Sequence, residues 1–114
     1  MTEDCVDIAI RRAIGGDTAA ISWLVTHADT MDDALVIVMA ALLERHPRRL
    51  RRADTVAATT RDRQVVAIAR AHLAGKSELV DALARDHLAD HPATLLVSWM
   101  AADALDRRSP TGRV

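Results

Sequence analysis

Two histidines, His87 and His91, stand four residues apart in a segment that also contains Asp86 and Asp90. If this segment is helical, the two imidazoles share one face and can chelate a transition metal such as zinc. A third ligand would come from an acidic residue on a facing helix or from another histidine, namely His27, His46 or His72. The alternative, which we favour, is that both side chains face solvent near a helix C-terminus, where the helix dipole stabilises a protonated histidine.

A second candidate site is a run of basic residues in the middle of the chain. It consists of Arg45, Arg48, Arg49, Arg51 and Arg52, and it extends to Arg61 and Arg63. Such a run can contact the phosphates of nucleic acid or another anionic ligand. However, no aromatic residues are interleaved for base stacking, and the net charge of the whole chain is −1, whereas nucleic-acid-binding domains are usually basic. We therefore favour a solvated face, or pairing with acids of the same chain, which would be Asp29, Asp32, Asp33 and Glu44.

The remaining residues form no recognisable reactive group. The single cysteine, Cys5, cannot form an internal disulfide, and its acidic neighbours oppose formation of a reactive thiolate. The sequence contains no glycine-rich phosphate loop, no cysteine pair and no HExxH motif, and its serines lack a local histidine-and-acid context. We therefore predict a protein without catalytic activity and without a cofactor. One free cysteine suits a reducing compartment such as the cytoplasm.

The elements that would position these residues are helical. Half of the 114 residues are hydrophobic, alanine is abundant, phenylalanine and tyrosine are absent, and glycine and proline are few. Alanine has the highest helix propensity, and a core without large rings closes by the near approach of Ala-rich helices. We predict an all-α fold, a compact bundle of five to seven short helices in antiparallel hairpins. A single domain would cover residues 1–107, and residues 108–114 would form a disordered tail.

Apolar periodicity and capping residues divide the chain into expected helices. Their bounds are Thr2–Ile14 with a cap at Thr2, Asp17–His27 with a cap at Asp17, a helix from a cap at Thr30 or Asp32 to His46, Arg61–Ala74 with a cap at Thr59 or Thr60, Lys76–Asp90 with a cap at Ser77, and Ala93–Arg107. The stretch Ala34–Leu43 is apolar on every side and should be buried all round. Leu79 is assigned to a buried face, and the segment Arg48–Ala58 is open to either helix or loop.

Several features bear on location and assembly. The longest apolar run, Ala34–Leu43, is much shorter than the roughly 20 residues of a membrane span. The N-terminus is acidic and lacks the apolar region of a secretory signal. Few lysines beside many alanines and arginines are typical of a high-GC genome and favour a bacterial origin. Acids dominate both ends of the domain and arginines its middle, which predicts acidic neighbours for the middle segment, within the fold or across a homodimer interface.

The two halves of the chain also show a faint internal similarity. Ala9–Ala13 aligns with Ala67–Ala71, Gly16 with Gly75, and Ala34–Leu43 with Ala93–Ala102. Each half would then be a three-helix unit of two amphipathic helices and one apolar helix. Duplication and a chance likeness between two Ala-rich patterns both stay open.

The second half carries a more specific pattern. It runs Thr60-Arg-Asp-Arg-Gln-Val-Val-Ala-Ile-Ala-Arg-Ala-His-Leu-Ala-Gly75 and continues with Leu79, Ala82, Leu83, Leu88-Ala-Asp-His-Pro92 and Leu95-Leu96. This pattern resembles the tetratricopeptide-type helical repeats of bacterial α-solenoid proteins, with Ala71 as the small residue of helix A, Gly75 at the tight turn and Pro92 after helix B. The family's usual aromatic residues are absent. The resemblance implies a binding scaffold and transfers no functional residue.

Together these patterns predict a small cytoplasmic interaction module without catalytic activity. It would bind a protein partner through a groove between helical hairpins, as a monomer or as a homodimer, and would not associate with membranes. The alternatives are a nucleic-acid-binding regulator that uses residues 45–63, and a metal- or ligand-binding helical bundle around His87 and His91.

Overall fold

The computed structural model of the chain describes residues 3–108, and all its regular elements in that range are α-helices. They are α1 (Glu3–Ile14), α2 (Thr18–His27), α3 (Ala34–Glu44), α4 (Arg49–Val56), α5 (Thr60–Leu73), α6 (Ser77–Asp90) and α7 (Leu95–Arg108). The predicted all-α bundle of five to seven helices is confirmed, and residues 48–58 contain helix α4. Helix α7 ends at Arg108, the first residue of the expected tail. The rest of that tail, residues 109–114, and the expected cap Thr2 lie outside the described residues.

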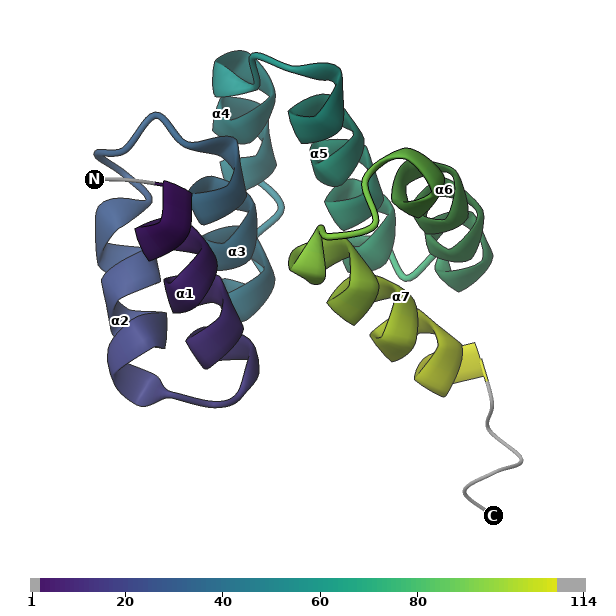
Figure 1. The fold of residues 1–114 in the computed structure, drawn as a ribbon, viewed down its shortest axis with the longest axis horizontal. Helices are drawn as coiled ribbons and strands as arrows, with labels where there is room; N and C mark the ends of the chain where they lie inside the picture. Colours follow the sequence, from purple (N-terminus) through teal and green to yellow (C-terminus); the bar gives the residue numbers. More distant parts are fainter. Residues whose placement is uncertain (1–2, 109–114) are drawn as a thin grey trace.

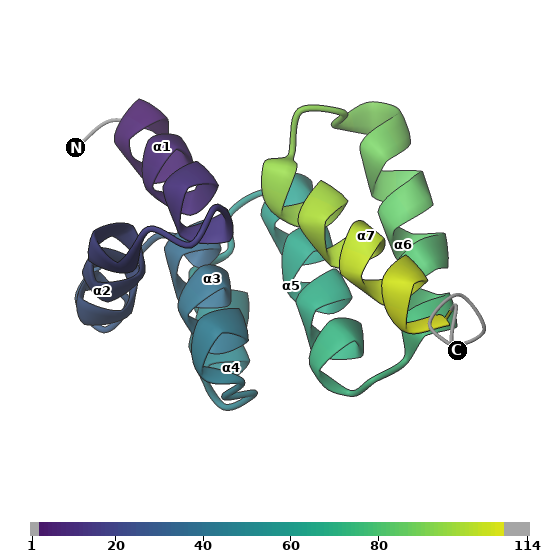
Figure 2. The same cartoon turned by 90° about the horizontal axis from the view of Figure 1, so that it is seen from below.

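The helices form two three-helix units that lie side by side (Figures 1 and 2). One unit contains α1, α2 and α3, the other contains α5, α6 and α7, and α4 links them along the chain. The units meet where α3 packs against α5 and where α1 approaches α7. None of the described helices combines the length and the apolar character that a membrane crossing requires.

Helix α3 lies at the centre of this arrangement, as its sequence predicts. It packs against α1, α2, α4 and α5, so it has almost no solvent-facing side. Its buried residues are Ala34, Val36, Ile37, Val38, Met39, Ala40, Ala41 and Leu42. In the second unit, Leu96, Val97 and Met100 of α7 are buried in the same core. The assignment of Leu79 to a buried face is wrong: Leu79 is 44% exposed, because the buried stripe of α6 follows Val80, Ala84 and His87.

Three of the helices end in the same left-handed turn. The turn residue is Gly16 after α1, Arg45 after α3 and Gly75 after α5, with φ angles of 92°, 52° and 75°. In each turn, the amide of this residue donates to the carbonyl three residues earlier, and the next amide donates to the carbonyl five residues before it. These two bonds define a Schellman motif, which favours glycine at the left-handed position. The motif at Arg45 ends α3 before the expected boundary at His46.

The helix starts agree only in part with the predicted caps. Asp17 accepts hydrogen bonds from two amides of α2, and Thr59 accepts one from α5, as predicted. The cap of α3 is Asp33 and not Thr30 or Asp32, because the Asp33 carboxylate accepts the Leu35 and Val36 amides. Ser77 is no cap but the first residue of α6, since the turn at Gly75 leads into the helix one residue early.

Replacing Gly75 by alanine tests the left-handed turn. An added Cβ meets nothing within 4 Å, so the only penalty is the positive φ, which costs a non-glycine residue about 1 kcal/mol. We expect Gly75→Ala to lower the free energy of unfolding by about that amount in urea denaturation. Gly15→Ala is the control, because Gly15 lacks a positive φ and should change stability by less than about 0.5 kcal/mol. Equal losses in both variants would contradict the turn.

Candidate functional site

His87 lies within a buried polar network that joins the three helices of the second unit. Its side chain has no solvent exposure. Nδ1 is 2.7 Å from Oε1 of Gln64 on α5, and Nε2 is 3.0 Å from Oγ1 of Thr94, just before α7. Because an amide oxygen only accepts, Nδ1 carries a proton, and in the neutral ring Nε2 then accepts the hydroxyl hydrogen of Thr94. The two bonds thus fix the orientation of the ring and the tautomer of its neutral form.

This geometry does not support a metal site on His87. Both ring nitrogens are engaged by Gln64 and Thr94, and within residues 3–108 no group of three or more His, Cys, Asp or Glu side chains is arranged to hold a metal ion. His91 contributes a ring contact to His87, with centroids 5.0 Å apart. The predicted solvent-facing position is also wrong for His87, because its partners come from α5 and from the start of α7, which the periodicity of α6 alone does not reveal.

Burial also sets the protonation state of His87. Removal of the ring from water lowers the pKa of His87 below its usual value of 6.5, and the positive fields of His91 and Arg61 lower it further, while Asp90 opposes the shift. A neutral ring fits the hydrogen-bond pattern, since the Nε2 atom needs its lone pair to accept from Thr94.

The basic run divides into two groups with different roles. Arg49 and Arg52 face inward: Arg49 Nε is 2.6 Å from Glu44 and its Nη1 is 2.8 Å from Asp29. Arg52 pairs with Asp32 at 3.0 Å and donates to the backbone carbonyls of Ala28 and Met31. The predicted intramolecular pairing is thus confirmed for Asp29, Asp32 and Glu44, whereas Asp33 serves as a helix cap. These contacts fasten α4 to the loop between α2 and α3.

The outward arginines of the run fall into two separate groups. Arg45, Arg48 and Arg51 are exposed around the turn between α3 and α4 and make no ion pair with the described part of the chain. Arg61 and Arg63 lie on α5, and Arg61 lines a crevice beside Ala34, at the opposite end of α3. A track along all seven arginines is therefore absent from this arrangement.

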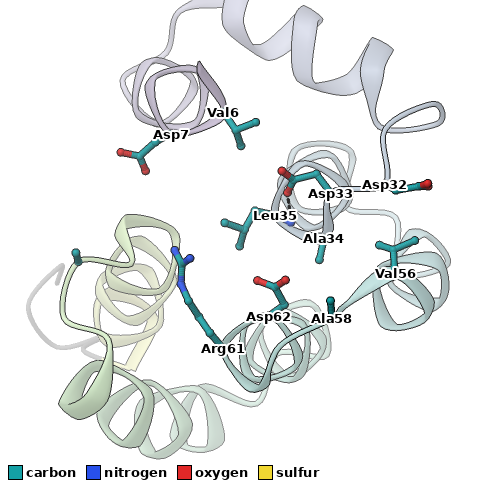
Figure 3. A pocket seen from close by; sticks show the side chains of 11 residues that line it. Val6, Asp7, Asp32, Asp33, Ala34, Leu35, Val56, Ala58, Arg61 and Asp62 are labelled. Carbon is teal, nitrogen blue, oxygen red and sulfur yellow. Dashed lines mark hydrogen bonds between the residues drawn. The ribbon is translucent and has the colours of Figure 1, made fainter. Parts of the chain in front are cut away.

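A crevice of about 380 Å³ opens between the two units (Figure 3). It is lined by Val6 and Asp7 of α1, by Asp32, Asp33, Ala34 and Leu35 around the start of α3, by Val56, Ala58, Arg61 and Asp62 from α4 to α5, and by Ala93 before α7. Figure 3 shows Val6 and Leu35 pointing into the space and Arg61 extending across it from α5. Sequence reasoning missed this site, because its residues come from segments far apart in the chain.

The charged groups of the crevice differ in how firmly they are held. Asp33 caps α3 and Asp32 pairs with Arg52, so both carboxylates are used by the fold. Asp7 has only a loose pairing with Arg11, at 3.8 Å between exposed side chains. The crevice therefore combines apolar side chains, among them Val6 and Leu35, with charged groups of both signs. Such a surface suits side chains inserted from another molecule.

No protein-family model, curated protein or solved structure matches this chain. Its function is therefore inferred from the site geometry and from the physical chemistry of its residues.

Substitutions of the adjacent residues Arg51 and Arg52 test whether the inward arginines stabilise the fold and the outward ones do not. Arg52→Ala removes the donor to two backbone carbonyls and the partner of Asp32. We expect it to lower the free energy of unfolding by about 1–2 kcal/mol, because hydrogen bonds to a charged group are involved but the side chain is partly exposed. Arg51→Ala should change it by less than about 0.5 kcal/mol. Equal effects in urea denaturation would refute the division of the run.

The network around His87 predicts a pH dependence of stability. The folded-state pKa of His87 lies below the unfolded value, so the unfolded chain takes up the proton first as the pH falls. The stabilisation should be present above the usual histidine pKa of about 6.5 and be lost progressively as the pH falls below it, through the lower folded-state pKa. His87→Gln should flatten the dependence of unfolding free energy on pH over this range.

His46→Gln is the matched control, since His46 is exposed. It should flatten the dependence less than His87→Gln does. An NMR titration of the His87 ring adds an independent measurement. A midpoint above 6.5 would contradict the buried neutral ring.

Proposed function

We propose that the protein is a small interaction module of the bacterial cytoplasm that binds a protein partner through the crevice between its two three-helix units and has no catalytic role. The observation that supports this proposal is the crevice itself. Both units contribute to its walls, which combine charged groups with apolar side chains such as Val6 and Leu35. Residues of this kind are left at a concave surface when another molecule covers them.

The size of the crevice favours a peptide segment or a loop of a partner. A space of about 380 Å³ accommodates a few side chains but not a whole secondary-structure element. Its position at the junction of the units means that a bound segment would contact α1, α3 and α5 together. Helical-hairpin scaffolds of the tetratricopeptide type, which residues 60–96 resemble, likewise bind partners at concave surfaces between helices.

A small-molecule ligand is the second candidate, because the same volume falls within the range of about 300–1,000 Å³ typical of ligand pockets. Nucleic acid and metal ions have less support as ligands. A nucleic-acid surface over residues 45–63 is interrupted by the inward Arg49 and Arg52. A metal centre at His87 conflicts with the two hydrogen bonds that its ring already makes.

A pair of exposed alanines tests the proposal. Ala58 lines the crevice, whereas Ala67 is exposed on α5 outside it. Ala58→Arg places a long charged side chain in the crevice and should reduce capture of a specific partner from a cell lysate by tenfold or more, a difference of about 1.4 kcal/mol. Ala67→Arg makes the same chemical change and should capture that partner as the wild-type protein does. The readout is quantitative mass spectrometry of captured proteins.

Circular dichroism and urea denaturation establish that both variants fold. Capture of the same proteins in the same amounts by all three chains would contradict a role for the crevice. A small molecule detected by native mass spectrometry in the wild-type protein, and lost from Ala58→Arg, would favour the second candidate instead.

A further inference from the structure

Arg45 is the one described residue other than glycine with a positive φ angle. It occupies the left-handed position of the Schellman motif after α3, where the two matching turns have Gly16 and Gly75. A left-handed backbone is unfavourable for any residue with a Cβ atom. The chain therefore keeps an arginine side chain at a place where glycine would be more stable. An observed backbone outlier of this kind points to a function for its side chain.

Stabilisation of the helix dipole does not account for this arginine. Basic residues near a helix C-terminus are favourable, and α1 and α5 have them within the last turn, at Arg11, Arg12, Arg70 and His72. Those residues have ordinary helical backbone. Helix α3 has no basic residue in its last turn, and the cation appears one position later, in the strained conformation. A cation inside the last turn of α3 would stabilise the helix dipole equally well. The position of Arg45 after the helix therefore has another cause.

The neighbours of Arg45 form a cationic surface. His46, Arg48 and Arg51 are exposed, and Arg48 and Arg51 are three residues apart, so they share one face at the start of α4. Arg45, Arg48 and Arg51 have no ion-pair partner among residues 3–108. A hollow of about 360 Å³ adjoins the turn. Its lining includes His46, Arg48, Arg49 and Arg52, and of the three outward arginines only Arg48 contributes to it.

The nearby acids do not cancel this charge. Asp29 and Glu44 also line the hollow, but both carboxylates contact Arg49. Asp32 pairs with Arg52. The two inward arginines thus form the framework of the site, and the three outward arginines provide its uncompensated positive charge.

We infer that the turn between α3 and α4 is a binding site for a polyphosphate group, held by Arg45, Arg48 and Arg51. Guanidinium groups bind phosphate oxygens in bidentate pairs, and several of them in one turn match a ligand with several linked phosphates. Neither tryptophan of the chain lines the hollow, so the phosphates and not a base would be recognised. The outward arginines follow the C-terminal end of α3, whereas the crevice is lined by residues around its N-terminal end.

Titration with sodium tripolyphosphate by isothermal calorimetry tests the inference. We expect Arg48→Ala to weaken binding about tenfold, which is the loss of one charge-assisted contact. Arg45→Gly should weaken it similarly and at the same time raise the midpoint of urea denaturation, because glycine relieves the left-handed strain. Weaker binding by a more stable protein cannot result from unfolding. Arg63→Ala removes the same charge on α5, remote from the turn, and should change affinity less than twofold.

A second experiment compares the affinities for an inorganic and a nucleotide polyphosphate. Equal affinities for tripolyphosphate and adenosine triphosphate would support recognition of the phosphates alone, and tighter binding of the nucleotide would support a nucleotide as the source. Three results would overturn the inference. They are no tripolyphosphate binding at millimolar concentration, an equal loss in Arg63→Ala, and tight binding of duplex DNA that requires both Arg63 and Arg48.

Discussion

The burial of α3 on nearly every side is the constraint on which the rest of the structure depends. A helix whose middle has no polar face cannot lie at a surface, so other helices must surround it. α1 and α2 cover it within the first unit, α4 folds back along it, and α5 brings the second unit against it. The side-by-side arrangement of the two units therefore follows from the composition of residues 34–43.

Helix α4 covers α3 with little apolar surface of its own. This helix is short, and only Leu50 and Ala53 within it are buried, so its apolar contact is small. Arg49 and Arg52 add ion pairs and carbonyl hydrogen bonds to the loop between α2 and α3. The acidic and basic blocks of the sequence meet at this place. The basic run is consequently in part a structural clamp, and only its outward residues are available for binding.

Local signals in the sequence predicted the helices well, and long-range features poorly. Asp17, Thr59 and Gly75 act through backbone groups within a few residues, so their roles were visible in the sequence. The partners of His87 were not, because Gln64 and Thr94 come from neighbouring helices. The crevice was missed for the same reason, since its lining is drawn from segments spread over most of the chain. The left-handed Arg45 also escaped prediction, because glycine is the residue that marks such a turn.

Different hydrogen bonds join the helices of the two units. Ala28 and His87 lie at the same distance along the chain from a turn glycine, Gly16 and Gly75 respectively. Ala28 and His87 are both buried. In the first unit, Arg52 of α4 donates to the carbonyl of Ala28, so the helix that covers α3 also ties down the end of α2. In the second unit, the larger ring of His87 reaches Gln64 and Thr94 from inside the core. The buried histidine thus joins α6 to α5 and to the segment before α7 from within the core, whereas Arg52 of α4 ties the first unit at Ala28 from outside.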